Sequence, residues 1–164
     1  MVRIRVLFVC AGNICRSPTA EGVVRRVLHE QKLADRIEVD SAGMQAYHVG
    51  EPPDRRAQRA AAKRGYDLSG LRARQVGAED FVHFDLILAM DRSCLAALQR
   101  SCPAERAEHL GLFMDYANGF DEDEVPDPYY GSGEAFDRVV DMVEDAARGL
   151  VASLKRESAG RRTE

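Results

Sequence analysis

The chain has 164 residues, of which 45% are apolar and 30% charged, and its net charge is −4. This length suits one domain with one core, and no segment approaches the roughly 18 uninterrupted apolar residues of a membrane span. The composition therefore argues against a membrane protein, and the acidic balance argues against a nucleic-acid-binding protein, whose surface is usually basic.

The first predicted strand, residues 4–10, leads directly through a short loop into a helix. Val6–Val9 is a continuous apolar run, as expected of a strand covered on both faces. Ser17 and Pro18 indicate a helix start, with Ser17 as a candidate N-cap and Pro18 as the first helical residue. That helix is expected to extend to about Lys32. The loop between the two elements reads Cys10-Ala11-Gly12-Asn13-Ile14-Cys15-Arg16.

This loop predicts an anion site with a nucleophile at its mouth. Gly12 and Asn13 are residue types that readily adopt positive φ, so successive backbone N–H groups can point inward at the helix N-terminus. Arg16 adds a planar fork that matches phosphate oxygens. Cys10 lies in the resulting positive field, which favours the nucleophilic thiolate. Taken singly, a buried cysteine and a Ser-Pro helix start are ordinary structural features. The complete set favours a catalytic anion site over a purely structural loop.

The run from Val9 to Pro18 resembles the signature of the low-molecular-weight protein tyrosine phosphatases: a cysteine, five residues, an arginine and a serine or threonine near the N-terminus. The resemblance covers about residues 4–154. It implies a single α/β domain with a four-stranded parallel sheet flanked by helices (flavodoxin-like), the phosphate loop following the first strand. It also implies that Cys10 is the nucleophile, that residues 11–16 bind phosphate, and that Ser17 stabilises the thiolate.

Residues 37–41 are predicted as the second strand, and its end carries two further site candidates. By resemblance, Ser41 hydrogen-bonds the loop residue Asn13 and supports the shape of the nest. Tyr47 occupies the place where relatives carry an aromatic residue facing the substrate. Because that residue is frequently tryptophan, a tyrosine leaves the width of the cleft open.

A basic helix is predicted next, over residues 55–64, with Asp54 as its N-cap and Gly65 at its end. A solvated helix face is the preferred interpretation of the basic residues in this region, and nucleic-acid binding is the alternative. These residues are Arg55, Arg56, Arg59, Lys63, Arg64, Arg72 and Arg74.

The second half of the chain continues the alternation of strand and helix. Residues 85–90 are predicted as a strand, followed by a helix that Asp91 caps and Pro103 ends. Residues 109–113 form a weak fourth strand. A polar loop then precedes an amphipathic helix over residues 134–154. The expected domain is 1–155, with a polar, frayed tail at 156–164.

The polar loop supplies a candidate proton donor. Asp127 lies between Pro126 and Pro128, which restrict the backbone around one carboxylate. An exposed turn would explain an isolated Asp-Pro, but Asp127-Pro128-Tyr129-Tyr130 resembles the family's general-acid motif. Asp127 is then the acid of the first step and the base of the second. Tyr129 and Tyr130 are expected to line the substrate cleft, with packing under the last helix as the alternative for Tyr130.

The remaining cysteines and the histidines are assigned more simply. Cys15 is interpreted as the redox partner of Cys10, since family members with a cysteine there use it that way and a reactive thiolate is readily oxidised. Cys94 and Cys102 are expected to pack in or near the core. The four histidines show no metal-ligand spacing, so no metal and no cofactor are expected.

Three rival functions are weighed on particular residues. Thioredoxin-coupled arsenate reductases share the loop but carry a further cysteine just after the third strand, where this chain has Asp91, and they lack the Asp127 motif. Protein arginine phosphatases typically have threonine where this chain has Ile14, which is expected at the rim of the phosphate nest, lining the substrate cleft. A catalytically dead phosphotyrosine-binding module would lack Cys10, Arg16 or Asp127.

The resemblance therefore favours a phosphotyrosine phosphatase that forms a cysteinyl-phosphate. Its expected partners are phosphotyrosine-containing proteins, with no nucleic acid and no membrane, and it is expected to be a monomer or weak homodimer. Residues 1–5 lack the apolar region of a signal peptide, and four cysteines are more typical of free thiols than of a disulfide framework. A cytoplasmic location is expected.

Overall fold

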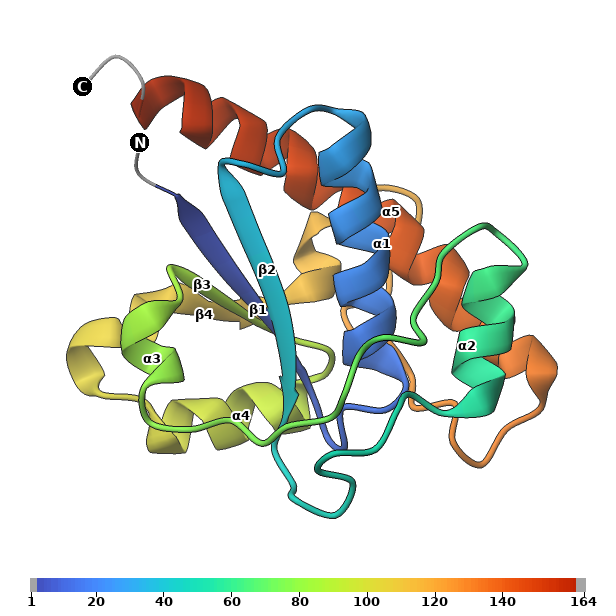
Figure 1. Ribbon diagram of the computed structural model, residues 1–164. Helices are drawn as coiled ribbons and strands as arrows, with labels where there is room; N and C mark the ends of the chain where they lie inside the picture. Colours follow the sequence, from blue (N-terminus) through green and yellow to red (C-terminus); the bar gives the residue numbers. More distant parts are fainter. Residues whose placement is uncertain (1–2, 162–164) are drawn as a thin grey trace.

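The computed structural model describes residues 3–161 and contains a four-stranded sheet with helices on both faces (Figure 1). The strands are β1 (Ile4–Cys10), β2 (Ile37–Gly43), β3 (Leu86–Ala89) and β4 (Leu110–Leu112). They are all parallel and lie in the order β2-β1-β3-β4. The predicted fold class is confirmed. Because the order reverses beside β1, the loops after β1 and β3 flank the switch point where such sheets bind ligands.

The helices form two layers around this sheet. Those of the chain are α1 (Arg16–Glu30), α2 (Arg55–Ala62), α3 (Asp80–His83), α4 (Arg92–Ser101) and α5 (Gly133–Arg161), together with the short 3-10 helices η1 (Ala104–His109) and η2 (Phe113–Tyr116). Helices α1 and α5 cover one face of the sheet, while α3 and α4 lie on the other (Figure 1). The short helices α3, η1 and η2 have too little apolar periodicity to be predicted from the sequence.

The central strand is buried on both sides because its apolar residues alternate between the two faces. Val6 and Phe8 pack with α1 and α5, and the Phe8 ring meets Phe113 edge-on at a centroid distance of 5.2 Å. Leu7 and Val9 pack toward α3 and α4. Because the strand is buried on both sides, Cys10, its last residue, has a defined position at the carboxyl end of the sheet.

Two predicted helix caps are confirmed. The Asp54 side chain accepts a hydrogen bond from the N–H of Arg56 at 2.8 Å, and Asp91 accepts one from the N–H of Cys94 at 2.8 Å. Each bond satisfies an N–H group that has no partner within the helix. The helix that follows Asp54 ends at Ala62, two residues earlier than predicted. Gly65 lies in the turn after it, with φ +88° in the left-handed region that favours glycine.

The start of α1 differs from the prediction. The helix begins at Arg16 rather than Pro18, Cys15 occupies the cap position, and no side chain caps the helix. Ser17 as an N-cap is therefore wrong. Ser17 lies inside the first turn, where its hydroxyl contacts Cys10 instead of the helix backbone. Nothing in the local sequence distinguishes these two uses of a serine before proline.

The last two elements also differ in length from the prediction. Strand β4 is shorter than residues 109–113, and α5 continues to Arg161 rather than ending at Leu154. The residues expected as a frayed tail are thus helical as far as 161, and 162–164 lie outside the described residues. The buried stripe of α5 continues through Ser158, four residues after Leu154. Because Ser158 is polar, the apolar pattern of the sequence did not indicate that the buried face of the helix continues to it.

Helices long and apolar enough to cross a membrane are not found within residues 3–161.

Candidate active site

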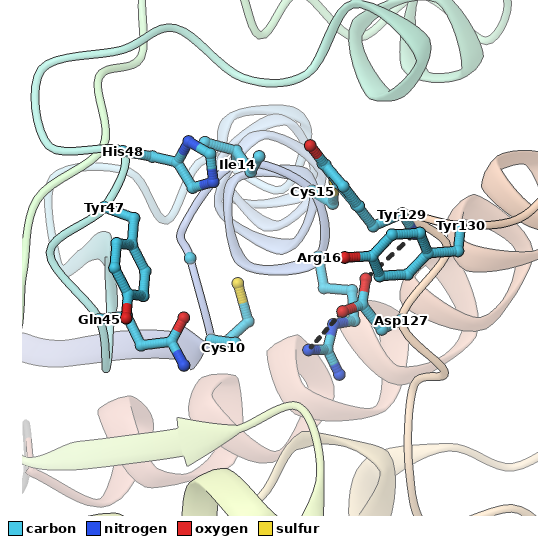
Figure 2. A pocket seen from close by; sticks show the side chains of 12 residues that line it. Cys10, Ile14, Cys15, Arg16, Gln45, Tyr47, His48, Asp127, Tyr129 and Tyr130 are labelled. Carbon is cyan, nitrogen blue, oxygen red and sulfur yellow. Dashed lines mark hydrogen bonds and ion pairs between the residues drawn. The ribbon is translucent and has the colours of Figure 1, made fainter.

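A pocket of about 330 Å³ lies at the carboxyl end of the sheet, above the switch point. The loop after β1 contributes Cys10, Ala11, Gly12, Ile14, Cys15 and Arg16, the segment after β2 contributes Gln45, Tyr47 and His48, and the late loop contributes Asp127, Tyr129 and Tyr130. Figure 2 shows Cys10 between two walls, with Tyr47 and His48 on one side and Asp127 with the two tyrosines on the other. Segments far apart in the sequence therefore meet around one sulfur atom.

The loop after β1 is held with its carbonyl groups engaged and several N–H groups free. The carbonyl oxygens of Cys10, Ala11, Ile14 and Cys15 accept hydrogen bonds from the backbone N–H groups of Met44, Gln45, Asp54 and Thr19 respectively. Within residues 3–161, no group accepts from the N–H of Gly12, Ile14 or Cys15. Such a turn of unsatisfied donors at a helix N-terminus is an anion nest.

Two residues make this turn possible. Asn13 has φ 58°, in the left-handed region that asparagine tolerates better than most residues. Gly43 ends β2 directly beside the loop, where an added Cβ would stand only 3.0 Å from the carbonyl oxygen of Ala11. A side chain at Gly43 would push against the loop backbone, which cannot move aside cheaply. The close approach of β2 thus depends on glycine at this position.

The sulfur of Cys10 has polar partners, although the residue is only 2% exposed. The N–H of Asn13 donates to Sγ at 3.3 Å, and Oγ of Ser17 lies 2.9 Å from it. Nδ2 of Asn13 donates to Oγ of Ser17 at 2.8 Å. The Ser17 proton is therefore available to the sulfur, since the alternative acceptor, the carbonyl of Ala42, is 3.5 Å away. These two donors can hydrogen-bond to negative charge on the sulfur.

A buried hydrogen-bond chain supports this arrangement from below. Nδ2 of Asn13 also donates to Oγ of Ser41 at 2.9 Å, and Ser41 donates to Oε1 of Glu21 at 2.7 Å. Oε2 of Glu21 accepts from Arg25 at 2.6 Å. Burial raises the pKa of the Glu21 carboxyl, against the opposing effects of Ser41 and Arg25. Glu21 was not recognised from the sequence because it reads as an ordinary helical glutamate.

Arg16 is held on three sides although it is only 3% exposed. Its Nη1 donates to Oδ2 of Asp91 at 2.7 Å and to the carbonyl of Val125 at 3.0 Å, while Nη2 lies 3.9 Å from Oδ2 of Asp127. Burial disfavours the charge, but the Cys10 sulfur and the Asp91 carboxylate outweigh it, so the pKa of Arg16 lies above its ordinary value. The guanidinium is a fixed positive charge facing the pocket (Figure 2).

Asp127 is the exposed carboxylate of the pocket. Its side chain is 52% exposed, and its Oδ1 accepts a hydrogen bond from the N–H of Tyr129 at 3.1 Å. The other oxygen faces Arg16, as the dashed line in Figure 2 shows. One carboxyl oxygen thus shapes the turn while the other is directed toward the anion site. A group in this position can exchange a proton with a ligand held by the nest.

The tyrosines form the rim of the pocket. Tyr47 is 82% exposed and Tyr130 is 95% exposed, so packing of Tyr130 under the last helix is excluded. Tyr129 is less exposed, meets Tyr130 edge-on at 5.0 Å and carries the guanidinium of Arg56 at 5.4 Å from its centroid. The three rings suit a flat aromatic group entering the pocket.

Ile14 lies deeper than its predicted place at the rim. It is only 8% exposed and packs in a cluster with Ala57 and Phe136, although it also lines the pocket. Ile14 is thus part of the wall. Its position follows from the Asp54 N–H, which holds the Ile14 carbonyl at 2.8 Å and draws the start of α2 against the loop.

All four cysteines are free. Cys15 lines the pocket, and burial, followed by the charges of Asp54, Cys10 and Asp127, raises the pKa of its thiol to about 12. Cys94 is buried and Cys102 half-buried against the cluster on the α4 side, as predicted. Among residues 3–161, no group of three or more metal-ligating side chains is placed to hold an ion.

Two lining residues were not singled out from the sequence. Gln45 and His48 both follow β2, and Nδ1 of His48 lies 2.6 Å from Oε2 of Glu51. The ring of His48 covers Gly12, where an added Cβ would stand 3.1 Å from Cδ2. The only local signal was their proximity to Tyr47.

Comparison with known proteins gives a consistent result. The family model described as "Low molecular weight phosphotyrosine protein phosphatase" matches residues 5–160. A putative low molecular weight protein-tyrosine-phosphatase of Synechocystis sp. is 46% identical, over 93% of this chain and 98% of the relative. One from Streptomyces coelicolor is 43% identical, over 96% and 97%. The crystal structure of a protein tyrosine phosphatase from Entamoeba histolytica, with Hepes in its active site, superimposes with a TM-score of 0.91 at 38% identity, covering 94% of this chain and 98% of that one.

Proposed function

The chain belongs to the low molecular weight protein tyrosine phosphatase family, and we propose that its pocket hydrolyses phosphotyrosine with Cys10 as nucleophile, Arg16 as phosphate ligand and Asp127 as general acid and base. The observation that carries this assignment is the meeting of the three groups in one pocket. Nη2 of Arg16 lies 3.9 Å from Asp127, and the Cys10 sulfur stands at the base of the same nest.

In the first step, the Cys10 thiolate attacks the phosphorus of a bound phosphotyrosine. The free N–H groups of the loop and the Arg16 guanidinium hold the other phosphate oxygens and stabilise the charge that spreads over them. The bond between phosphorus and the tyrosyl oxygen breaks, and Asp127 gives its proton to that oxygen. The products are free tyrosine hydroxyl and a cysteinyl-phosphate.

In the second step, Asp127, now a carboxylate, accepts a proton from a water molecule. The water oxygen attacks phosphorus, the bond to sulfur breaks, and inorganic phosphate leaves. The departing Cys10 thiolate is stabilised by the N–H of Asn13 and the hydroxyl of Ser17. Cys10 therefore acts as nucleophile and then as leaving group, and Asp127 as acid and then as base.

Several properties of the chain in the cell belong to the same proposal. One copy of the chain supplies the whole described pocket, which supports a monomer or weak homodimer. Four free thiols fit a cytoplasmic location, because reducing compartments keep cysteines unpaired. The substrates would be phosphotyrosine-containing proteins rather than nucleic acids or membranes, and none of the steps above calls for a metal or a cofactor.

The first experiment compares phosphotyrosine, phosphoserine and phosphoarginine peptides with and without a chelator. Phosphotyrosine should be preferred, with turnover unaffected by the chelator. Cys10→Ser should abolish turnover and still bind inorganic phosphate, because the nest and Arg16 remain. Substantial residual turnover in Cys10→Ser would disprove the covalent mechanism.

The second experiment tests the choice of phosphotyrosine over phosphoarginine. The side chain of Ile14 lines the pocket wall without a polar group for a guanidinium. Ile14→Thr should shift the kcat/KM ratio toward phosphoarginine by roughly tenfold. Preference for phosphoarginine by the wild type would overturn the substrate assignment while leaving the mechanism intact.

A further inference from the structure

The basic residues between 55 and 74 separate into paired and unpaired groups once the chain is folded. Five of them have carboxylate or carbonyl partners: Arg56 binds Asp54, Lys63 binds Asp137, Arg64 binds Asp141 and Glu144, Arg72 binds backbone carbonyls, and Arg74 binds Asp40 and Asp80. Arg55 and Arg59 are exposed and have no hydrogen bond or ion pair with any group in residues 3–161. The free positive charge of this region thus lies on α2.

Helix α2 adjoins the active-site pocket. The N–H of Asp54, just before the helix, donates to the carbonyl of Ile14 in the phosphate loop at 2.8 Å. Arg56, in the first turn, places its guanidinium over the Tyr129 ring that lines the pocket. Arg55 lies between Asp54 and Arg56, the two residues that make these contacts. The first turn of α2, which carries Arg55, therefore lies next to the opening through which a substrate must enter.

A second hollow continues from this border. It has a volume of about 180 Å³ and lies between α2 and the first turns of α5, which run side by side in Figure 1. Its lining consists of Arg56, Arg59, Ala60, Lys63, Gly133 and Asp137. Arg56 lines this groove and also contacts Tyr129, so these two side chains separate the groove from the active site. The groove contains three cationic side chains and one carboxylate.

We propose that this α2 groove binds acidic side chains of the substrate polypeptide that flank the phosphotyrosine. The inference rests on the proposed function, because it assumes that a phosphotyrosine side chain fills the neighbouring pocket. With that side chain in the pocket, the adjoining peptide must lie across the rim. On the α2 side it meets Arg59, which lines the groove, and passes Arg55 in the first turn of the helix; neither charge has a partner within the described residues. Complementary charge at a rim increases the rate and specificity of association.

An acidic peptide fits the surroundings better than a nucleic acid does. Residues 121–124, which directly precede Val125 and its contact with Arg16, are all acidic. Glu122 pairs with Arg138, and Asp123 and Glu124 pair with Arg92, so this segment offers no free cation to a polyanion. A long polyanion needs an extended run of unpaired cations, whereas the basic region between 55 and 74 offers only Arg55 and Arg59. A short acidic segment on one side of the phosphotyrosine needs only the groove. Because the unpaired positive charge lies on the α2 side, it would also orient the peptide.

The experiment uses matched phosphotyrosine peptides in which two aspartates are placed before the phosphotyrosine, after it, or replaced by asparagines. At low salt, only one of the two aspartate peptides should show a higher wild-type kcat/KM than the asparagine peptide. The difference should be about fivefold, since surface ion pairs contribute modestly. The preference should shrink as ionic strength rises. Equal kcat/KM for all three peptides at low salt would overturn the proposal.

Reversing the charge of Arg55 and Arg59 tests whether these two residues cause the preference for the acidic peptide. Arg55→Glu combined with Arg59→Glu should remove or invert the preference and leave hydrolysis of a small aryl phosphate unchanged, because that substrate has no flanking residues. The matched control is Arg100→Glu, an exposed arginine near the end of α4 opposite the Asp91 cap, which should behave as wild type. A preference that survives the double reversal would overturn the proposal.

Two further outcomes would assign the groove to another occupant and would likewise overturn the proposal. One is loss of single-stranded oligonucleotide binding in the double variant without a change in peptide preference. The other is self-association of the wild type that the double variant abolishes. Failure of the proposed function is distinguishable from all of these, since the wild type would then not hydrolyse the small aryl phosphate.

Discussion

Asp91 binds Arg16 through one carboxylate oxygen and caps α4 through the other. Oδ2 accepts from Nη1 of Arg16 at 2.7 Å, and Oδ1 accepts from the N–H of Cys94 at 2.8 Å. The contact exists because β1 and β3 are neighbours, so the loops that follow them meet. Arg16 is the first residue of α1, but its guanidinium is oriented by the cap residue of α4. This makes Asp91 a positioning residue for Arg16, the proposed phosphate ligand.

We expect Asp91→Asn to lower kcat/KM by roughly tenfold, because the charged partner that orients Arg16 is lost while the cap survives. Phosphate affinity, measured by competitive inhibition, should fall in parallel. Asp54→Asn is the matched control, since Asp54 caps α2 and pairs with Arg56 rather than Arg16. A similar loss of activity in both variants would show that helix capping, not Arg16, is responsible.

The stability of Asp91→Asn should also differ from wild type with pH. Burial opposes ionisation of Asp91, but the hydrogen bonds from Cys94 and Arg16 outweigh it and hold the pKa of this carboxyl below its ordinary value. A lowered folded-state pKa gives stability that is present above the unfolded-state pKa and lost as pH falls through the acidic range. Urea unfolding should therefore show the wild type losing its advantage over the variant on acidification. A constant difference would contradict this.

Glu21 gives a pH dependence of the opposite sign. Because burial raises its pKa in the folded state, its contribution to stability is present below the unfolded-state pKa and lost as pH rises through the folded-state pKa. Glu21→Gln removes this titration. The variant should therefore gain stability relative to wild type as pH rises above the ordinary carboxyl range. Ser41→Ala keeps the carboxyl and serves as control: it should weaken the Asn13 support without abolishing the titration.

Asp127→Asn should slow hydrolysis of poor leaving groups by roughly 10²–10⁴-fold and of activated aryl phosphates much less, because only a basic leaving oxygen needs the proton. The measurement is kcat/KM against leaving-group basicity for a series of aryl phosphates. Asp121→Asn, an exposed carboxylate in the same loop, should behave as wild type. Equal losses across the whole series would assign Asp127 a structural role.

Peroxide should inactivate the wild type reversibly. Oxidation of the Cys10 thiolate gives a sulfenic acid, and attack by the Cys15 thiolate on that sulfur would form a disulfide and release water. Burial raises the pKa of Cys15 to about 12, so the thiolate fraction, and with it the rate of disulfide formation, should increase between about pH 6 and pH 9.

Cys15→Ser should oxidise further and recover poorly with thiol. Cys94→Ser is the control, since Cys94 is also buried with a pKa raised to about 12 but lies on α4. Mass spectrometry after reversible inactivation checks the bond directly. Absence of a Cys10–Cys15 disulfide would remove Cys15 from the redox cycle.

The sequence by itself identified the loop from Cys10 to Arg16 and the strand before it. This was possible because the interactions that define the loop are local: Cys10 contacts Asn13 and Ser17, three and seven residues away. Short patterns of residue type likewise predict the alternating burial of β1 and the caps at Asp54 and Asp91. Asp127 was found only because its motif resembled a known one, since an Asp-Pro turn has no distinctive local physics.

Only the tertiary structure decided what surrounds that loop. Asp91 and Val125 meet Arg16 across 75 and 109 residues of chain, and Ser41 meets Asn13 across 28. These contacts depend on strand order, which places β1 between β2 and β3. The unpaired arginines of α2 were equally undetermined, because pairing depends on which carboxylates α5 and its neighbours bring within reach. Short patterns specify a turn or a cap, whereas a long-range hydrogen bond forms only when packing of the whole core brings its two ends together.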